Sequence, residues 1–562
     1  MVKRIDLIAA LLALGVSTPA LAQTDSDLKN AAKTPDRILT YGMTYSEQRF
    51  SPLTEINPQT VNRLVPAWSY SLDSDKGEES QPLVMDGVMY ITSHDKTVAL
   101  DAVTGKEIWK TPVVYPEGTV KVVCCGIVNR GGALYNGRFY RTLLDGRVQA
   151  LDAKTGKEIW AVRAGDTKDG IAMTGAPLIA NGVVIVGVAG SEFSIRGYID
   201  GYDPQSGQRL WRRYTIPRPG EPGADTWPDN ARRAAGGSTW TTGSYDPDLD
   251  LVYWGTGNPS PWNPLDRKGD NLYTDSILAI RPKTGEIVWH YQTSPNDPFD
   301  HDNVNSLVLA DINAGGQPRK VVMQAARNGF FYVLDRATGK LLAANKYVKV
   351  TWADHVDMAT GRPVWSESTK QILDHVAHVE TWPFTAGGTN WFPFSYSPRT
   401  GLAYVNTFNI GEEYEPLPPG QLGDLQPGDR SGGNTVKTKN IYPEGEARGY
   451  LKAVDPLTGQ AKWQTGFKSP NYSGTLVTAG GLVFTGELTG EFIAVDANGG
   501  KILWQFQTPS GIIGQPVTWE KNGEQYVTVT SGIGGVYIRQ PDPNLQHVPR
   551  GGSLWTFKLL KP

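Results

Sequence analysis

The sequence predicts an all-β fold, an eight-bladed β-propeller built from tryptophan-docking repeats. The stretch 99–109 reads Ala-Leu-Asp-Ala-Val-Thr-Gly-Lys-Glu-Ile-Trp and returns almost unchanged at 150–160. Trp109, Trp160 and Trp211 end the first three copies at an even spacing of about 51 residues, and such fixed periods are typical of propellers. Strand-like runs also stand at both ends of the chain, where they can pair with each other.

Each copy is expected to form a strand, a tight turn and a second strand. Its Asp-x-x-Thr-Gly core suits a turn, because the Asp side chain can bond backbone amides and Gly tolerates a positive φ. The closing Trp is expected to pack between neighbouring units. Looser copies follow at 201–211, 279–289, 333–343, 453–463 and 494–504. The eighth blade is expected to combine 65–72 with 553–559, since pairing the two ends closes the ring.

The composition narrows the class of function. The chain has 562 residues, a formal net charge of −3 and 20% charged residues. A nucleic-acid-binding protein would show a basic field, so no nucleic-acid partner is expected.

Residues 1–22 have the pattern of a secretory signal peptide. Lys3 and Arg4 precede an apolar run at 7–16, and Ala20-Leu21-Ala22 forms a cleavage site. The run is too short to span a membrane. We therefore expect an exported, periplasmic protein whose mature part, 23–562, is a single propeller domain.

Both cysteines of the chain are adjacent, Cys124 and Cys125. In an oxidising compartment they can bond to each other, although neighbouring Cα atoms lie about 3.8 Å apart, below the usual disulfide range. Such a ring would be strained, which suggests a role other than global stability. The alternative is two free thiols. No Cys-x-x-Cys-His motif occurs, so no c-type haem is expected in this chain.

Acidic residues concentrate in the loop 297–303. Asp300 and Asp302 are two apart, and alternate side chains of an extended backbone share a face. With Glu192 and Asn258, which also stand at strand ends, they form an all-oxygen set suited to a hard cation. The alternative is a solvated acidic turn.

These motifs together resemble one family, the pyrroloquinoline-quinone (PQQ) dependent alcohol dehydrogenases, which include methanol and ethanol dehydrogenases. The resemblance rests on the vicinal cysteines, the Trp-ended repeats and Gly-Thr-Gly-Asn-Pro at 255–259. It implies that Asp300 is the catalytic base and that Glu192, Asn258, Asp300 and Asp302 hold a metal ion. The implied PQQ-binding residues are Glu79, Cys124, Cys125, Arg130, Thr174, Gly190, Ser191, Trp240, Arg327, Asn390 and Trp391.

Asp302 bears on the identity of the metal. The resemblance implies that an Asp at this position marks the lanthanide-dependent members, whereas the calcium-dependent members carry a small uncharged residue there. One more carboxylate favours a more highly charged ion, because Coulomb attraction scales with charge. We therefore expect a lanthanide(III) ion, with Ca²⁺ as the alternative.

The expected function is oxidation of small primary or larger alcohols to aldehydes, with electrons passed to a soluble cytochrome c. One alternative is a calcium-dependent dehydrogenase of alcohols, polyols or sugar alcohols. Another is a non-enzymatic propeller scaffold, which would need none of the implied site residues. The oligomeric state stays open, with a homodimer as one option. The long segments 218–237, 346–388 and 412–449 are expected to form the walls of the substrate entrance.

Overall fold

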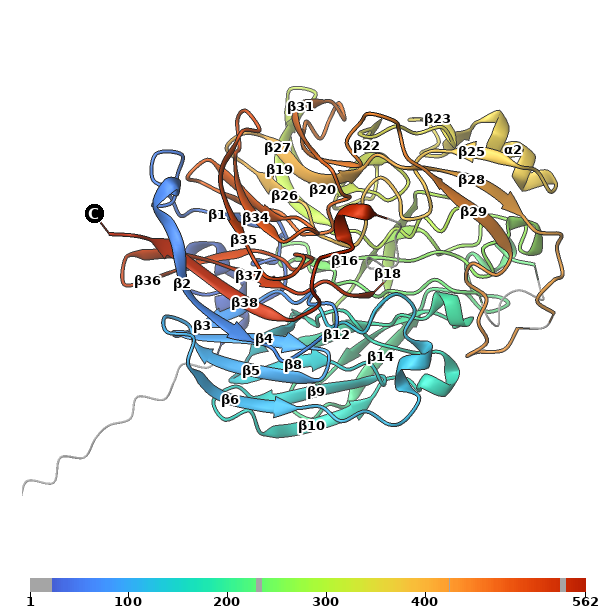
Figure 1. Cartoon of the computed structure of the whole chain (residues 1–562). Helices are drawn as coiled ribbons and strands as arrows, with labels where there is room; N and C mark the ends of the chain where they lie inside the picture. Colours follow the sequence, from blue (N-terminus) through green and yellow to red (C-terminus); the bar gives the residue numbers. More distant parts are fainter. Residues whose placement is uncertain (1–22, 229–234, 424, 536–541, 562) are drawn as a thin grey trace, which may run out of the picture.

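The structure is a computed structural model that describes residues 23–228, 235–423, 425–535 and 542–561. The predicted signal peptide, residues 1–22, lies outside the described residues. Nearly all regular structure in the described part is β-strand, which confirms the predicted all-β class (Figure 1). Its two α-helices are short, α1 (Asp25–Lys29) and α2 (Glu367–Asp374). None of its helices has the length and apolar character that a membrane span requires.

Most of the strands of the described residues group into eight sheets of four or five strands that follow one another along the chain. The first four sheets are β3 (Leu83–Met85), β4 (Val88–Ser93), β5 (Lys96–Asp101) and β6 (Glu107–Pro112); β7 (Gly132–Tyr135), β8 (Arg138–Thr142), β9 (Arg147–Asp152) and β10 (Glu158–Arg163); β11 (Leu178–Ala180), β12 (Val183–Gly187), β13 (Tyr198–Tyr202) and β14 (Arg209–Tyr214); and β15 (Ser244–Asp246), β16 (Leu251–Gly255), β17 (Ser276–Ile280) and β18 (Ile287–Gln292).

The later sheets continue this order. They are β19 (Val308–Ala314), β20 (Gln317–Ala325), β21 (Phe330–Asp335) and β22 (Leu341–Lys346); β26 (Ser395–Ser397), β27 (Leu402–Phe408), β30 (Gly449–Val454) and β31 (Ala461–Phe467); β32 (Leu476–Thr478), β33 (Leu482–Gly486), β34 (Glu491–Asp496) and β35 (Ile502–Gln507), joined by β1 (Phe50–Ser51); and β36 (Val517–Lys521), β37 (Glu524–Ser531), β38 (Ser553–Leu559) and β2 (Leu64–Ser71).

The last sheet joins the two ends of the described chain. β2 pairs antiparallel with β38, although almost the whole chain separates them, and Figure 1 shows the blue strand beside the red one. This pairing is the one predicted from the stretches 65–72 and 553–559. Each of the two strands is therefore hydrogen-bonded along the edge that faces the other.

The repeated turn explains how neighbouring sheets fit together. Asp101 accepts hydrogen bonds from the backbone N–H groups of Val103 and Thr104 at 3.2 and 2.8 Å, which closes the turn. Gly105 has φ +71°, and a Cβ atom there would lie 2.6 Å from the ring of Trp68. The indole N–H of Trp68 in turn donates to the carbonyl of Ala102 at 3.0 Å. The glycine is thus required both by the turn and by the close approach of Trp68, which belongs to the neighbouring sheet.

The same indole-to-carbonyl bond recurs around the molecule. The further pairs are Trp109–Ala153, Trp160–Pro204, Trp211–Pro282, Trp463–Ala497 and Trp504–Leu64.

An N-terminal segment, residues 38–51, ties six of the sheets together. Its backbone pairs in turn with the first strand of each. These bonds join Ile38 to Val84, Leu39 to Leu134, Tyr45 to Tyr245, Ser46 to Leu309, Gln48 to Tyr396 and Arg49 to Val477, at 2.8–3.0 Å.

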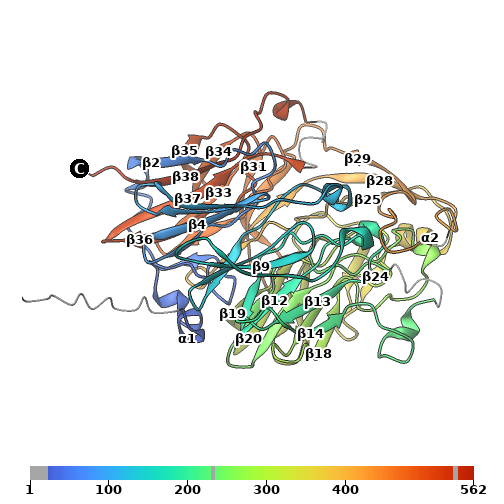
Figure 2. The ribbon, with the colours of Figure 1, turned by 90° about the horizontal axis from the view of Figure 1, so that it is seen from below.

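Two of the segments predicted as long loops contain regular structure. Residues 346–388 hold β23 (Ala353–Val356), β24 (Pro363–Trp365), α2 and β25 (Val379–Thr381). Residues 412–449 overlap a hairpin of β28 (Gly411–Pro416) and β29 (Val436–Ile441), which adds to β25 in a three-stranded sheet. Both views place this extension at the end of the molecule away from the C-terminus (Figure 2).

Candidate active site

One cavity of about 360 Å³ collects most of the predicted site residues. The predicted residues that line it are Glu79, Cys124, Cys125, Arg130, Thr174, Gly190, Glu192, Trp240, Asp300, Asp302, Arg327, Asn390 and Trp391. They come from loops of several different sheets, so the closed arrangement of sheets is what brings them to one place.

The loops that enter the first strands of the sheets supply many of these side chains. Glu79, Thr174, Trp240, Trp391 and Tyr472 each stand four residues before β3, β11, β15, β26 and β32. Equivalent positions of repeated sheets lie at equivalent places in space, so these five side chains reach the same cavity.

Arg130 lies between two aromatic rings. Its guanidinium carbon is 4.7 Å from the ring centres of both Trp240 and Trp391. Its Nη2 lies 2.7 Å from the carboxylate of Glu79, and its Nη1 donates to the hydroxyl of Thr174 at 2.7 Å. This wall of the cavity therefore combines flat rings with a buried cation, which suits a planar ring that carries carboxylates.

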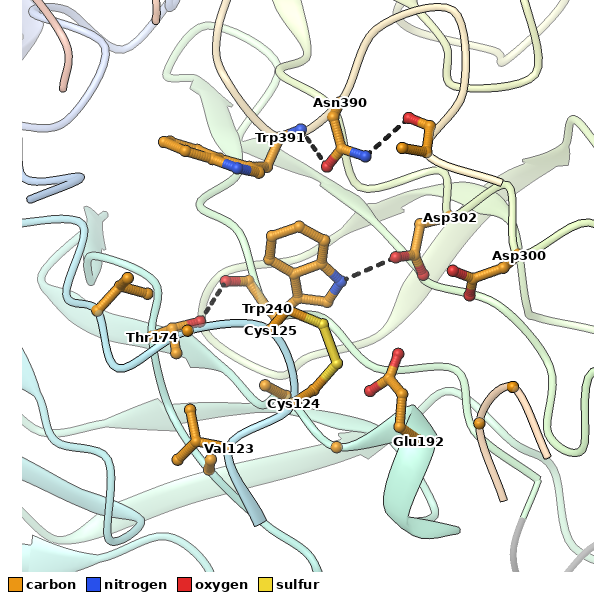
Figure 3. Close-up of a pocket in the computed structure, with 18 of the residues that line it drawn as sticks. Val123, Cys124, Cys125, Thr174, Glu192, Trp240, Asp300, Asp302, Asn390 and Trp391 are labelled. Carbon is orange, nitrogen blue, oxygen red and sulfur yellow. Dashed lines mark hydrogen bonds between the residues drawn. A yellow bond between two sulfur atoms is a disulfide. The ribbon is translucent and has the colours of Figure 1, made fainter. Parts of the chain in front are cut away.

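Cys124 and Cys125 form a disulfide with each other, as the sequence predicted, and their Cα atoms are 3.7 Å apart. The bond follows the short helix η3 (Thr119–Val122) and is exposed to the cavity. Figure 3 shows the disulfide and the indole of Trp240 at the same cavity.

Asp300 and Asp302 share one arginine. Arg327 donates to the carboxylate of Asp302 at 2.6 Å and to that of Asp300 at 3.1 Å. The indole N–H of Trp240 also donates to Asp302, at 3.3 Å. The carboxylates of Asp300, Asp302 and Glu192 gather beside Trp240 (Figure 3).

Burial is the main influence on the pKa values of the three carboxyl groups, Asp300, Asp302 and Glu192. Burial raises the pKa of Asp300 well above its usual value; Arg327 opposes the rise, while Asp302 and Glu192 add to it. Burial likewise raises the pKa of Asp302, against the effect of Arg327. Burial and then Asp302 raise the pKa of Glu192 to about 7. Carboxylates in this situation are stabilised in their charged form by a nearby cation.

Asn258 and Ser191, also predicted for the site, do not line the cavity. The backbone N–H of Asn258 donates to Asp302 at 2.7 Å, so this residue lies directly behind the acidic group. Ser191 is buried, and its hydroxyl donates to that of Ser238 at 2.9 Å.

The donor chemistry fits a hard cation. The side-chain oxygen Oδ1 of Asn258 and the Oδ1 of Asp300 are buried and lack hydrogen-bond partners. Glu192 and Asp302 add only oxygen donors, the kind that hard cations prefer. Among the residues that the structure describes, no group of three or more His, Cys, Asp or Glu side chains is arranged to hold a metal by itself. The unpartnered amide oxygen of Asn258 is the fourth oxygen donor of the predicted set.

Further lining residues were not predicted for the site, among them Trp262, Thr385 and Arg430. Thr385 and Arg430 fall in the segments 346–388 and 412–449, which the sequence marked as entrance walls without naming side chains. The carbonyl of Thr385 accepts a hydrogen bond from Arg327 at 2.8 Å. No local motif identifies these residues, since each depends on how a long loop folds back.

Comparison with known proteins agrees with this geometry. The family model described as glucose/ethanol/alcohol dehydrogenase, beta-propeller domain, of the PQQ type, matches residues 39–360 and 446–527. The quinohemoprotein alcohol dehydrogenase ADH IIB of Pseudomonas putida is 40% identical over 95% of this chain and 79% of its own length. The quinoprotein alcohol dehydrogenase PedH of Pseudomonas putida is 38% identical over 99% of this chain and 96% of its own.

Among solved structures, a europium-containing methanol dehydrogenase superposes with a TM-score of 0.89. It is 35% identical and covers 95% of this chain and 100% of its own.

Proposed function

The chain belongs to the family of PQQ-dependent alcohol dehydrogenases and is an enzyme of that class, and from this premise we propose that it oxidises primary alcohols to aldehydes with a lanthanide(III) ion beside PQQ. The single observation that carries the choice of metal is the placement of Asp302. Its carboxylate lines the same cavity as Asp300 and Glu192 and shares Arg327 with Asp300, so it adds negative charge to the place where a cation would bind.

In this proposal the chain's residues hold and orient the reactants. Arg130, Glu79, Thr174 and Asn390 would bind the polar groups of the cofactor, and Trp240 and the disulfide would contact its ring. PQQ, when bound, supplies the two-electron oxidation. Glu192, Asn258, Asp300 and Asp302 are the residues that would hold the metal ion, which would supply Lewis acidity.

Asp300 is proposed as the base that takes the proton from the substrate hydroxyl. Its buried carboxylate is held by Arg327 at 3.1 Å, which fixes its direction and favours its charged form. The europium-containing methanol dehydrogenase supports the choice of a lanthanide, because europium is a lanthanide. That protein is 35% identical to this chain and covers 95% of it.

The other parts of the proposal have support of different kinds. Eight sheets of four or five strands among the described residues support an eight-bladed, single-domain propeller. The signal pattern at 1–22 supports export to the periplasm. A soluble cytochrome c is the proposed electron acceptor, because the reduced cofactor must pass its electrons on before the next turnover.

Reconstitution tests the proposed metal. Metal-free protein is loaded with PQQ and either La³⁺ or Ca²⁺, and alcohol oxidation is followed with an artificial electron acceptor. We expect turnover with La³⁺. Full activity with Ca²⁺ and none with La³⁺ would reject the lanthanide and leave the calcium-dependent alternative.

A further inference from the structure

The described part of the loop between β28 and β29, residues 417–423 and 425–435, is bonded to the part of the chain that carries Glu192. The backbone N–H groups of Ser431 and Gly432 donate to the carbonyl of Glu192 at 2.8 and 3.2 Å. The hydroxyl of Ser431 lies 2.5 Å from that of Ser260. These bonds fix the loop beside the acidic group.

The hydrogen bonds of Ser431 and Gly432 to Glu192 hold Arg430 at the cavity. Arg430 directly precedes the anchored Ser431, is exposed to solvent and lines the cavity together with Gly432 and Gly433. A Cβ atom on Gly432 would lie 2.6 Å from Cγ of Glu192, so only glycine lets the loop approach this closely. A Cβ on Gly433 would meet only Trp262, at 3.8 Å, which leaves room beside Arg430.

Arg430 differs from the other two cavity arginines in that its guanidinium is not paired with a carboxylate among the described residues. Arg130 is paired with Glu79, and Arg327 with Asp300 and Asp302. The guanidinium of Arg430 makes no hydrogen bond or ion pair within the described parts of the chain, although its charge opposes the rise that burial causes in the pKa of Glu192. It is therefore a cation whose bonding groups are available to a molecule that enters the cavity.

We propose that Arg430 is a specificity-determining residue that favours alcohols whose far end carries a negative charge, such as ω-hydroxycarboxylates. The inference rests on the proposed oxidation of alcohols in this cavity. With the hydroxyl directed at Asp300, a carboxylate at the other end of the substrate meets the guanidinium, whose planar donor pair matches it in two hydrogen bonds. Trp262 provides an apolar surface for the chain between them.

The test compares matched substrates on the holoenzyme. The ω-hydroxycarboxylates from 3-hydroxypropionate to 6-hydroxyhexanoate are each paired with the 1-alkanol of equal carbon number, and kcat/KM is measured for both. The ratio of hydroxycarboxylate to alkanol is expected to fall roughly tenfold in Arg430→Gln at the chain length that spans the cavity. The alkanol values are expected to change less than about twofold. Arg430→Lys is expected to keep part of the ratio, since it retains charge but not the paired donors.

Lys437→Gln is the matched control, because it removes one positive charge from the same hairpin. Lys437 is exposed, pairs with Glu415 at 2.9 Å and does not line the cavity. Its ratio should equal that of the unaltered enzyme. Arg430→Gln with an unchanged ratio, or with equal losses on both substrates, would overturn the role of Arg430 while leaving alcohol oxidation intact. Failure of the unaltered enzyme to oxidise either substrate would instead reject the proposed function.

Discussion

The carboxylate of Asp302 accepts a hydrogen bond from the backbone N–H of Asn258 at 2.7 Å. This bond joins the loop that follows β16 to the loop that precedes β19. Asp302 thereby becomes a fixed member of the acidic group, because its other oxygen is held by Arg327 and Trp240.

Asp302→Ala is expected to abolish turnover supported by La³⁺, with a loss of roughly 100-fold or more, because a charged ligand is removed. Steady-state rates and the metal content of the desalted protein check this. Asp302→Asn is the companion variant, since it lacks the charge and keeps one acceptor oxygen, which can serve either Asn258 or Arg327 but not both. If the Ala variant bound La³⁺ and turned over at the full rate, Asp302 would not be a required ligand.

Arg130→Met is expected to lower the free energy of unfolding by about 3 kcal/mol, because it leaves the buried carboxylate of Glu79 without its cation. The two side chains are 7% and 2% exposed. Urea unfolding followed by tryptophan fluorescence measures the change. The double variant Glu79→Gln/Arg130→Met should recover part of the loss. A single variant as stable as the unaltered protein would show that the pair contributes nothing.

Phe557→Ala is expected to destabilise the sheet that joins the chain ends, by about 3–5 kcal/mol. Phe557 is fully buried on β38, and its ring centre lies 5.4 Å from that of Trp504 and 5.2 Å from that of Phe506 in the preceding sheet. The adjacent Lys558→Ala is the control, because its side chain is 39% exposed and should matter by less than about 0.5 kcal/mol. If Phe557→Ala and Lys558→Ala had the same thermal midpoint, the packing of Phe557 would not stabilise the sheet that joins the chain ends.

The stability of the protein is expected to fall as the pH rises, in part through Glu78. Burial raises the pKa of Glu78 from 4.5 to about 8, and the hydroxyl of Ser93 donates to it at 2.9 Å. The folded state then binds this proton more tightly than the unfolded state. Its contribution is complete below about pH 4.5 and is lost as the pH rises through about 8.

Glu78→Gln should therefore lose less stability than the unaltered protein between pH 5 and about 8.5. Thermal midpoints across this range measure the difference, and Glu444→Gln, at an exposed position, is the control. Parallel pH curves for Glu78→Gln and the unaltered protein would refute the assignment.

The repeat made much of the fold and part of the site predictable. Trp109 and Gly156 could be placed in neighbouring units because the same turn and the same tryptophan recur along the chain. The acidic pair Asp300 and Asp302 was predicted from its spacing, and both line the cavity. Arg430 and Trp262 were not predicted, because neither belongs to a repeated position.

The amino-acid sequence was enough to predict the all-β class, the turns, the pairing of β2 with β38 and the kinds of side chain that precede the first strands. These features depend on patterns within about ten residues or on their repetition, which fix backbone geometry locally. The folded chain was needed to reveal that Arg327 joins Asp300 to Asp302, that residues 38–51 bind six sheets, and that the loop with Arg430 is bonded to Glu192. Those contacts link segments far apart in the chain, so they exist only once the sheets have assembled and their loops have found partners across the cavity.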